Sequence, residues 1–297
     1  MFKKLLGIAG LMAALALNPA SATSVTAAEP IRFAVTDVEG LEMLQREYGP
    51  FAEILREASG MEVELFPVTS RTAAAEAIRA EKVDFVLTGP AEYVVMRKLT
   101  QAYPVVGFSR PDYFSAIVVM ADSGINAPAD LKGETVAFSD VGSTSGHLGP
   151  MQLLADYGLD PRSEVKPLHV HRNVGHEALK RGDIAGLGVN YRSWTDKVRA
   201  KDPDLEPGAF KVIARGPDLP NDVLVAGPHV DKAVVAKVRD VFDAKSDDLV
   251  AAILEGEENQ KYKGMKFLSG VQDKDYQYIR DAYATIGYPQ YSDFVGN

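Results

Sequence analysis

The sequence predicts an α/β protein of two lobes, each with a parallel-rich sheet, around a hinged cleft. Short apolar segments typical of strands alternate with segments of helical periodicity over residues 31–87, and again over residues 116–189. Two long helical patterns, at residues 232–244 and 274–286, follow them. Alternation of this kind indicates parallel sheets covered by helices. Ligands of open α/β sheets bind at the carboxyl ends of strands, so two facing sheets predict a cleft between them.

The first series begins at residue 31. Strands are expected at residues 31–36, 63–68 and 83–87, and the dipeptide Gly89-Pro90 stops the third of them. The first helix is predicted by apolar residues that recur at helical spacing, namely Leu41, Leu44, Tyr48, Phe51 and Leu55. The alanine-rich residues 71–82 predict the second helix.

The second series starts near Tyr113. Its expected strands are residues 116–120, 135–138, 166–171, 184–189 and 210–214, and its expected helices are residues 142–157 and 175–181. A last strand at residues 223–226 leads to the long helices. The predicted division is therefore lobe 1 at residues 29–112 with 220–297, and lobe 2 at residues 113–219.

The first 28 residues have the pattern of a secretory signal peptide. Lys3 and Lys4 precede an uncharged apolar run, and small-residue cleavage sites end at Ala22 and Ala28. The run of about 13 residues is short for a membrane anchor, which needs about 20, so an uncleaved anchor is the weaker interpretation. We expect cleavage after Ala28, with Ala22 as the alternative, and a periplasmic protein.

Composition narrows the function further. The chain of 297 residues has 46% hydrophobic and 25% charged residues, as in ordinary globular proteins, and no cysteine. Its net charge of −9 disfavours a nucleic-acid partner, which requires a basic face. With this charge, any bound anion must be held by local dipoles and donors instead of the overall field.

The segment Gly142-Ser143-Thr144-Ser145-Gly146 carries the strongest chemical signal. It follows a predicted strand and opens a predicted helix. Three hydroxyls beside the free N–H groups of a helix N-terminus suit a tetrahedral oxyanion. A plain N-cap and turn is the simpler alternative. The segment is not a Walker A loop, because no Gly-Lys-Ser/Thr follows, and Thr144 stands where a nucleophile elbow requires its serine.

The chain resembles the phosphonate/phosphite-binding proteins of ABC importers, which take up phosphate-like oxyanions. The resemblance rests on Ser143-Thr144-Ser145-Gly146 with Pro150, and on four weaker segments: Gly89-Pro90-Ala91-Glu92-Tyr93, Asp130-Leu131-Lys132-Gly133, His171 with Arg181-Gly182-Asp183, and Pro220-Asn221-Asp222. It implies a type II periplasmic-binding fold that captures a phosphonate, phosphite or phosphate without catalysis or cofactor. The implied partner is an ABC permease, and we expect a monomer.

The resemblance also implies the site. It assigns Ser143, Thr144 and Ser145 to the phosphorus-bound oxygens, His171 to a further donor, and Tyr113 to the wall. Tyr93 is a further candidate, as a residue of the wall or of the core. Asn190 and Asp222 fall where relatives that bind aminoalkyl phosphonates use acids, and Arg71 falls where a tyrosine is expected. Asparagine cannot give an ammonium group a charge-assisted bond, so these departures shift the expected ligand from a zwitterion toward a plain anion.

Two other classes of function stay open at this point. One is a periplasmic sensor component, in which the loaded protein docks on the sensor domain of a histidine kinase. The other is a periplasmic hydrolase or metalloenzyme that uses a local cluster of His169, His171, His176 and Glu177. No His-Glu-x-x-His pattern or cysteine supports a metal, so no metal site is expected.

Overall fold

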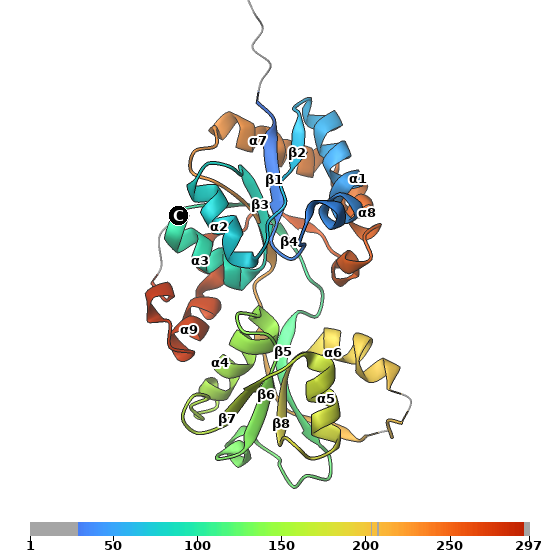
Figure 1. Cartoon of the computed structure of the whole chain (residues 1–297), viewed down its shortest axis with the longest axis vertical. Coiled ribbons are helices and arrows are strands. Elements are labelled where there is room, and N and C mark those ends of the chain that lie inside the picture. The colour runs from blue at the N-terminus through green and yellow to red at the C-terminus, as the bar shows by residue number, and fades with distance from the viewer. Residues whose placement is uncertain (1–28, 203, 207, 294–297) are drawn as a thin grey trace, which may run out of the picture.

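The computed structural model describes residues 29–202, 204–206 and 208–293, without the side chains of Arg71 and Thr72. The expected signal peptide, residues 1–28, lies outside this range. Two lobes stand end to end along the long axis of the molecule (Figure 1). Within the described residues no helix is both long and apolar enough to cross a bilayer.

Lobe 1 is built on a six-stranded sheet of order β11-β4-β10-β3-β1-β2. Its strands are β1 (Ile31–Val35), β2 (Val63–Leu65), β3 (Phe85–Thr88), β4 (Tyr103–Phe108), β10 (Asp222–Ala226) and β11 (Phe267–Leu268). β1 runs parallel to β2 and β3, whereas β10 is antiparallel to both of its neighbours, β3 and β4. A late strand of the chain therefore lies in the middle of a sheet begun by early ones.

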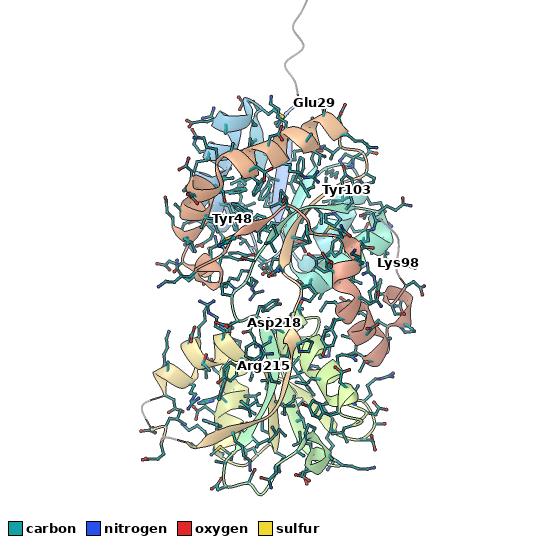
Figure 2. All side chains as sticks on the ribbon, turned by 180° about the vertical axis from the view of Figure 1, so that it is seen from behind. Glu29, Tyr48, Lys98, Tyr103, Arg215 and Asp218 are labelled. Carbon is teal, nitrogen blue, oxygen red and sulfur yellow. The ribbon has the colours of Figure 1, made fainter. Side chains whose placement is uncertain are left out.

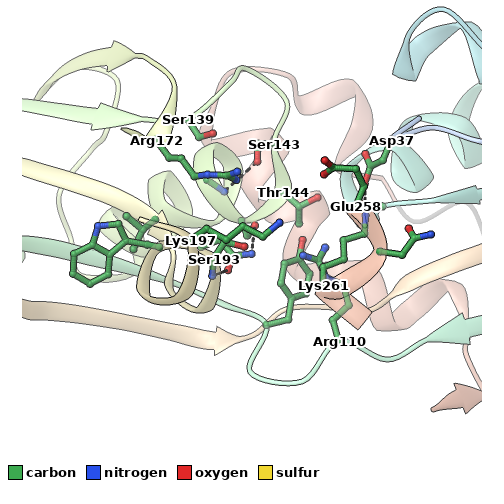
Figure 3. A pocket seen from close by; sticks show the side chains of 18 of the residues that line it. Asp37, Arg110, Ser139, Ser143, Thr144, Arg172, Ser193, Lys197, Glu258 and Lys261 are labelled. Atoms are coloured by element: carbon green, nitrogen blue, oxygen red, sulfur yellow. Dashed lines mark hydrogen bonds and ion pairs between the residues drawn. The ribbon is translucent and has the colours of Figure 1, made fainter. Parts of the chain in front are cut away.

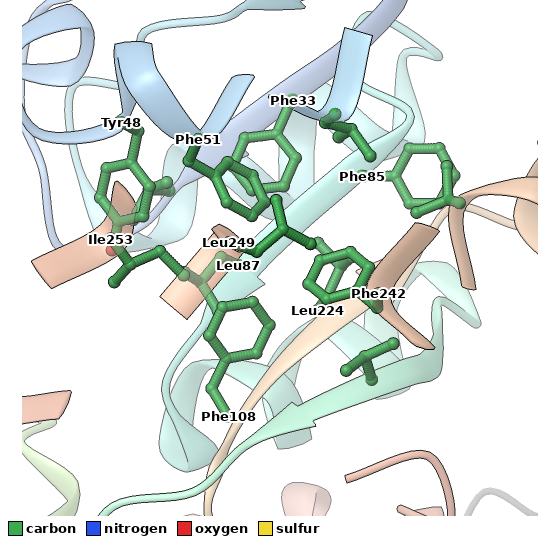
Figure 4. Close-up of a cluster of buried hydrophobic side chains, with 14 of the residues drawn as sticks. Phe33, Tyr48, Phe51, Phe85, Leu87, Phe108, Leu224, Phe242, Leu249 and Ile253 are labelled. Atoms are coloured by element: carbon green, nitrogen blue, oxygen red, sulfur yellow. The ribbon is translucent and has the colours of Figure 1, made fainter. Parts of the chain in front are cut away.

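Helices cover both faces of this sheet. They are α1 (Leu41–Ser59), α2 (Arg71–Arg79), α3 (Pro90–Thr100), α7 (Lys232–Ala244), α8 (Ser246–Leu254) and α9 (Gln277–Thr285). Alternate strand residues face opposite sides, so Phe85 and Leu87 join one core and Val86 joins the other. The first core, under α1, α7 and α8, is rich in aromatic rings, among them Phe51 and Phe242 at 5.9 Å between centroids (Figure 4).

Lobe 2 has a five-stranded sheet of order β7-β6-β8-β5-β9. Its strands are β5 (Phe114–Met120), β6 (Thr135–Phe138), β7 (Lys166–His169), β8 (Gly186–Asn190) and β9 (Phe210–Asp218), and its helices are α4 (Gly149–Asp156), α5 (Arg172–Lys180) and α6 (Tyr191–Lys197). β6 is parallel to β7 and β8, and β5 is antiparallel to β8 and β9. Trp194 of α6 is the largest fully buried side chain, in the core beneath α5 and α6.

Shorter helical turns fill the connections. A π-helical turn occupies Thr144–Leu148, and 3₁₀ turns occupy Pro128–Leu131, Arg199–Lys201, Glu258–Tyr262, Asp273–Tyr276 and Pro289–Tyr291.

Two segments join the lobes, one from β4 to β5 and one from β9 to β10. Arg215 and Asp218 mark the lobe 2 end of the returning segment (Figure 2), and they form an ion pair of 2.9 Å on the surface. A third link runs along the side, where α9 lies beside α4 and the Tyr278 hydroxyl donates to Asp156 at 3.0 Å (Figure 1).

The two-lobed, parallel-rich α/β fold predicted from the sequence is confirmed. Several element predictions were wrong: the strand expected at residues 63–68 ends at Leu65, the helix expected at residues 71–82 ends at Arg79, and the helix expected at residues 142–157 is a π turn followed by α4. Helix α3 starts at Pro90, where the sequence had indicated only the end of a strand. The lobe boundaries stay a prediction, which the membership of the two sheets supports.

Candidate functional site

A cavity of about 300 Å³ lies between the lobes (Figure 3). Lobe 2 supplies the segment 143–146, which we call the hydroxyl loop, together with side chains of β8, α5 and α6. Lobe 1 supplies residues that follow β1 and β3 and residues near Glu258. Arg110 and Tyr113 come from the segment that joins the lobes. The cavity therefore lies where strands of both sheets end, as expected for this architecture.

The hydroxyl loop presents donors at the start of a helix. Ser143 is the N-cap residue, and its Oγ accepts from the Gly146 amide at 3.3 Å. The π turn at Thr144–Leu148 continues directly into α4. The amides of Thr144 and Ser145 are the first of this helical run, and no carbonyl oxygen of the described residues accepts from them. Free amides at the positive end of a helix are suited to bind an anion.

Lobe 2 fixes the shape of this loop from below. The Ser139 amide donates to the Gly146 carbonyl at 2.8 Å, and the Ser115 hydroxyl donates to the Ser145 carbonyl at 3.0 Å. The Gly142 amide donates to Nδ1 of His147 at 3.1 Å. A Cβ atom on Gly146 would lie 2.5 Å from Cβ of Ser139, so this close approach requires glycine.

Thr144 also connects the two lobes. The Ala91 amide, in the first turn of α3, donates to Oγ1 of Thr144 at 3.0 Å. The N-termini of α3 and of the helical run in lobe 2 therefore converge on one hydroxyl. Thr144 accepts in this bond, and its hydroxyl also hydrogen-bonds with that of Tyr113; rotation of these two hydroxyls lets either turn a proton toward a ligand oxygen.

Tyr113 and Asn190 complete the polar wall around the loop. Asn190 donates from Nδ2 to Ser145 Oγ at 2.9 Å and accepts the Ser193 amide at 2.9 Å, which fixes its orientation. Tyr113 is buried beside Ser145 and Thr144. Burial raises the pKa of Tyr113 to about 12, so its hydroxyl keeps its proton at neutral pH and can act as a donor.

Acidic groups near the cavity are already engaged by cations of the protein. Arg110 contacts the buried Asp222 carboxylate at 3.2 Å, and the Tyr262 hydroxyl donates to the same carboxylate at 2.6 Å. Burial alone would lower the pKa of Arg110, but the Asp222 charge raises it above its ordinary value. Lys261 donates to Asp37 at 2.6 Å. The site thus combines neutral donors with two carboxylates, Asp37 and Asp222, whose charge is balanced by cations of the protein.

Comparison with known proteins identifies this arrangement. The sequence profile of the ABC-transporter phosphonate periplasmic substrate-binding proteins matches residues 33–266. The chain belongs to this family. Its members are, by that description, binding components of transporters.

Individual members of the phosphonate-binding family agree with the profile. The chain is 28% identical to the phosphate-import protein PhnD of Mycolicibacterium smegmatis over 243 residues, 76% of this chain and 74% of that protein. It is 27% identical to the phosphonates-binding periplasmic protein of Escherichia coli over 242 residues, 76% and 68% of the two chains. A structure of PhnD1 from Prochlorococcus marinus (MIT 9301) in complex with methylphosphonate shares the fold, with a TM-score of 0.63, 18% identity, and coverage of 87% of this chain and 98% of that one.

The structure brings together five of the residues that the family resemblance predicted: Ser143, Thr144, Ser145, Tyr113 and Asn190 all line the cavity. Their contacts with a ligand stay a prediction. Asp222 lies behind the wall with Arg110, so it is not a free partner for an ammonium group.

Two other predicted residues, His171 and Tyr93, are not brought to the cavity. His171 is exposed, and its Nδ1 accepts from the Asn173 amide at 3.4 Å as the cap of α5. Tyr93 is buried in the core of lobe 1, where its hydroxyl donates to Asp273 at 2.6 Å. The side chain of Arg71 lies outside the described part of the chain. Their assignment to the ligand therefore gains no support from the geometry.

Four cations of the cavity wall were not singled out from the sequence: Arg110, Arg172, Lys197 and Lys261. Each stands in a connection or at a helix end, where a charged side chain is ordinarily solvated. Of the four, Arg110 alone had a position in the sequence that could have indicated the cavity, because it lies where the chain passes from lobe 1 to lobe 2. The others are brought to the cavity by tertiary folding alone.

The histidine cluster of the metalloenzyme hypothesis is divided in the structure. His169 packs against His147 at 4.6 Å between ring centroids, whereas His176 lies in the lobe 2 core. Atoms of His176, Glu177 and Asp202 lie close enough to share an ion. However, Trp194 donates to Nδ1 of His176 at 3.2 Å, which places the ring proton on Nε2, toward Asp202 at 2.8 Å. Hydrogen bonds from Lys180 and His176 lower the pKa of Asp202 to about 2. Asp202 is therefore ionised and forms an ion pair with Lys180.

Proposed function

We propose that the cleft captures a small phosphorus oxyanion, a phosphonate, phosphite or phosphate, and that the loaded protein delivers it to an ABC permease. The observation that carries this proposal is the hydroxyl loop at the convergence of two helix N-termini. It offers three hydroxyls and two free amides within one turn, with Tyr113 beside them. Several donors around one point fit the several acceptor oxygens of a tetrahedral anion.

The family supports the same ligand class. One relative is named for phosphate import, another for phosphonates, and PhnD1 was solved with methylphosphonate. Transport requires no chemistry at the ligand, so the proposal assigns no catalytic residue. A monomer is sufficient, because both walls of the cavity come from one chain.

A periplasmic location is part of the proposal. It rests on the pattern of residues 1–28 and on the description of the family as periplasmic. The mature chain should then begin near Glu29. N-terminal sequencing of the protein after cell fractionation tests this, and full-length chain in the cytosol would contradict it.

The central test removes one hydroxyl from the loop. Hydrogen bonds to charged groups contribute about 1.5–3 kcal/mol, so Thr144→Ala should weaken binding of methylphosphonate, phosphite or phosphate about ten- to a hundredfold. Thr100→Ala is the matched control, because Thr100 is equally buried and hydrogen-bonded but stands at the far end of α3. Calorimetric titration of both variants, with melting curves on the ligand-free proteins, gives the answer. Unchanged affinity in a folded Thr144→Ala protein would remove the loop from the site.

A further inference from the structure

The lobe 2 wall of the cavity carries positive charge and no negative charge. Arg172, the first residue of α5, and Lys197, the last residue of α6, both line the cavity and are exposed. Figure 3 shows Arg172 beside the side chains of Ser139 and Ser143, and Lys197 extending toward Thr144. No aspartate or glutamate of lobe 2 is among the lining residues.

These two cations have no partner acid. Nearby cations do: Lys180 lies 2.7 Å from Asp202, and Arg192 lies 3.6 Å from Asp196. Across residues 29–202, 204–206 and 208–293, neither Arg172 nor Lys197 forms an ion pair. The chain as a whole has a net charge of −9. Two unpaired cations that face one cavity therefore create a local positive potential, opposite in sign to the field of the whole chain.

On the lobe 1 side, two carboxylates are already paired with cations of the protein. Asp37 is held by Lys261, and Asp222 by Arg110, as described above. The remaining acids of the wall are Glu92, whose carboxylate lies against Gly89 at the start of α3, and Glu258, which is exposed. An ammonium group on the ligand would therefore be repelled by the two lobe 2 cations, and Asp37 and Asp222 on the other side are already paired.

We propose that Arg172 and Lys197 bind a second anionic group of the ligand. The hydroxyl loop takes the phosphoryl group, and the cations take a carboxylate at the other end of the organic substituent. The cleft would then select phosphonates with a carboxylate end over those with an uncharged or ammonium end. This inference rests on the proposed function, because it assumes that the loop holds the phosphoryl group.

Four ligands that differ only in the group on phosphorus test the selection. We expect phosphonoacetate to bind wild-type protein about tenfold or more tighter than propylphosphonate or methylphosphonate, and 2-aminoethylphosphonate to bind weakest, in calorimetry at one pH and ionic strength. The double variant Arg172→Gln/Lys197→Gln should lose that advantage while its affinity for methylphosphonate changes by less than about threefold. Arg181→Gln is the control, since Arg181 is the C-cap residue of the same helix α5 but is paired with Asp183 away from the cavity.

The outcomes separate the two proposals. If methylphosphonate binds but phosphonoacetate binds no tighter, the second subsite is wrong and the proposed function stands. If the double variant weakens methylphosphonate and phosphonoacetate equally, the cations serve the phosphoryl group or Glu258 across the cleft, and the subsite is again wrong. If wild-type protein binds none of the four ligands, the second subsite is wrong, and the proposed function fails as well if phosphite and phosphate do not bind either.

Discussion

His147 supports the hydroxyl loop from beneath through the unprotonated form of its ring. Its side chain is 4% exposed, and Nδ1 accepts the Gly142 amide at the start of the loop. Burial lowers the pKa of His147 to about 4, and the neighbouring His169 contributes to the shift. A protonated ring would turn the acceptor into a donor and break this contact. Protonation of His147 would therefore remove one of the contacts that hold the loop.

Acid should destabilise the protein through this residue. The pKa of His147 falls from an ordinary 6.5 to about 4 on folding. Between pH 6.5 and pH 4 the unfolded chain therefore binds a proton at this residue that the folded chain does not bind. The free energy of unfolding then decreases as pH falls from 6.5 to 4, by up to about 3 kcal/mol in total. His147→Gln, which can still accept from Gly142, should make this decrease shallower. Urea unfolding at pH 7.5, 6 and 5 measures it.

His171→Gln is the control for this experiment. His171 is also in lobe 2 but is exposed, so the variant should follow the wild-type pH dependence. Equal slopes for wild type and His147→Gln would show that the ring does not carry the effect.

Single residues of the site differ in how well the sequence predicts them. Ser143, Thr144 and Ser145 are predictable because consecutive residues at a strand-to-helix junction must face the same edge. His171 also follows a strand, yet its ring turns back and caps α5 by accepting from the Asn173 amide. The pattern of residues in the sequence does not predict this orientation of the ring. Arg110 and Asp222 are 112 positions apart, and only the completed fold brings them together.

At the scale of elements, two junctions show where sequence rules compete. Gly89-Pro90 ends β3, as predicted, but proline also fits the first position of a helix, and α3 begins there. Because α3 begins at Pro90, the Ala91 amide lies in the first helical turn and can donate to Thr144. The π turn is a second case: a Cβ atom on Gly146 or Gly149 would overlap Ser139 or Ser115, a close approach that helical periodicity does not reveal.

The π turn makes a prediction of its own. In Gly146→Ala the new methyl group would overlap Ser139, so the turn must shift; we expect a loss of about 1–3 kcal/mol in stability and weaker anion binding. Gly49→Ala is the control, because Gly49 stands within α1 with open space around it, and alanine there should be neutral or stabilising. Melting curves and a phosphate titration of both variants check this. A Gly146→Ala protein that melts and binds like wild type would contradict the packing argument.

At the scale of the whole molecule, a buried ion pair links the two segments that run between the lobes. Arg110 belongs to the segment from β4 to β5, and Asp222 begins β10 at the end of the segment from β9. Their contact therefore connects the two segments that join the lobes. Arg110 also stacks on Tyr113, with its guanidinium carbon 3.7 Å from the ring centroid. The geometry of the hinge is thus coupled to the wall of the cavity.

Asp222→Asn should cost about 3 kcal/mol of stability, because it leaves the Arg110 charge buried without its counter-ion. Asp218→Asn is the matched control at the other end of the same segment; its side chain is 80% exposed in a surface pair, and its loss should cost less than about 1 kcal/mol. Urea unfolding of both variants measures the difference. Equal small losses would mean that the hinge pair adds nothing to stability.

The interleaved sheet order has a consequence for the sequence of events as the chain emerges from its N-terminus onward. When residue 218 has emerged, all five strands of lobe 2 are free to pair, but β10 has not yet reached its place between β3 and β4. Those two strands must wait with open edges, which are sites of mispairing between chains. The strand that ends this wait begins with Asp222, so an emerging chain completes its older lobe and secures its hinge in one step.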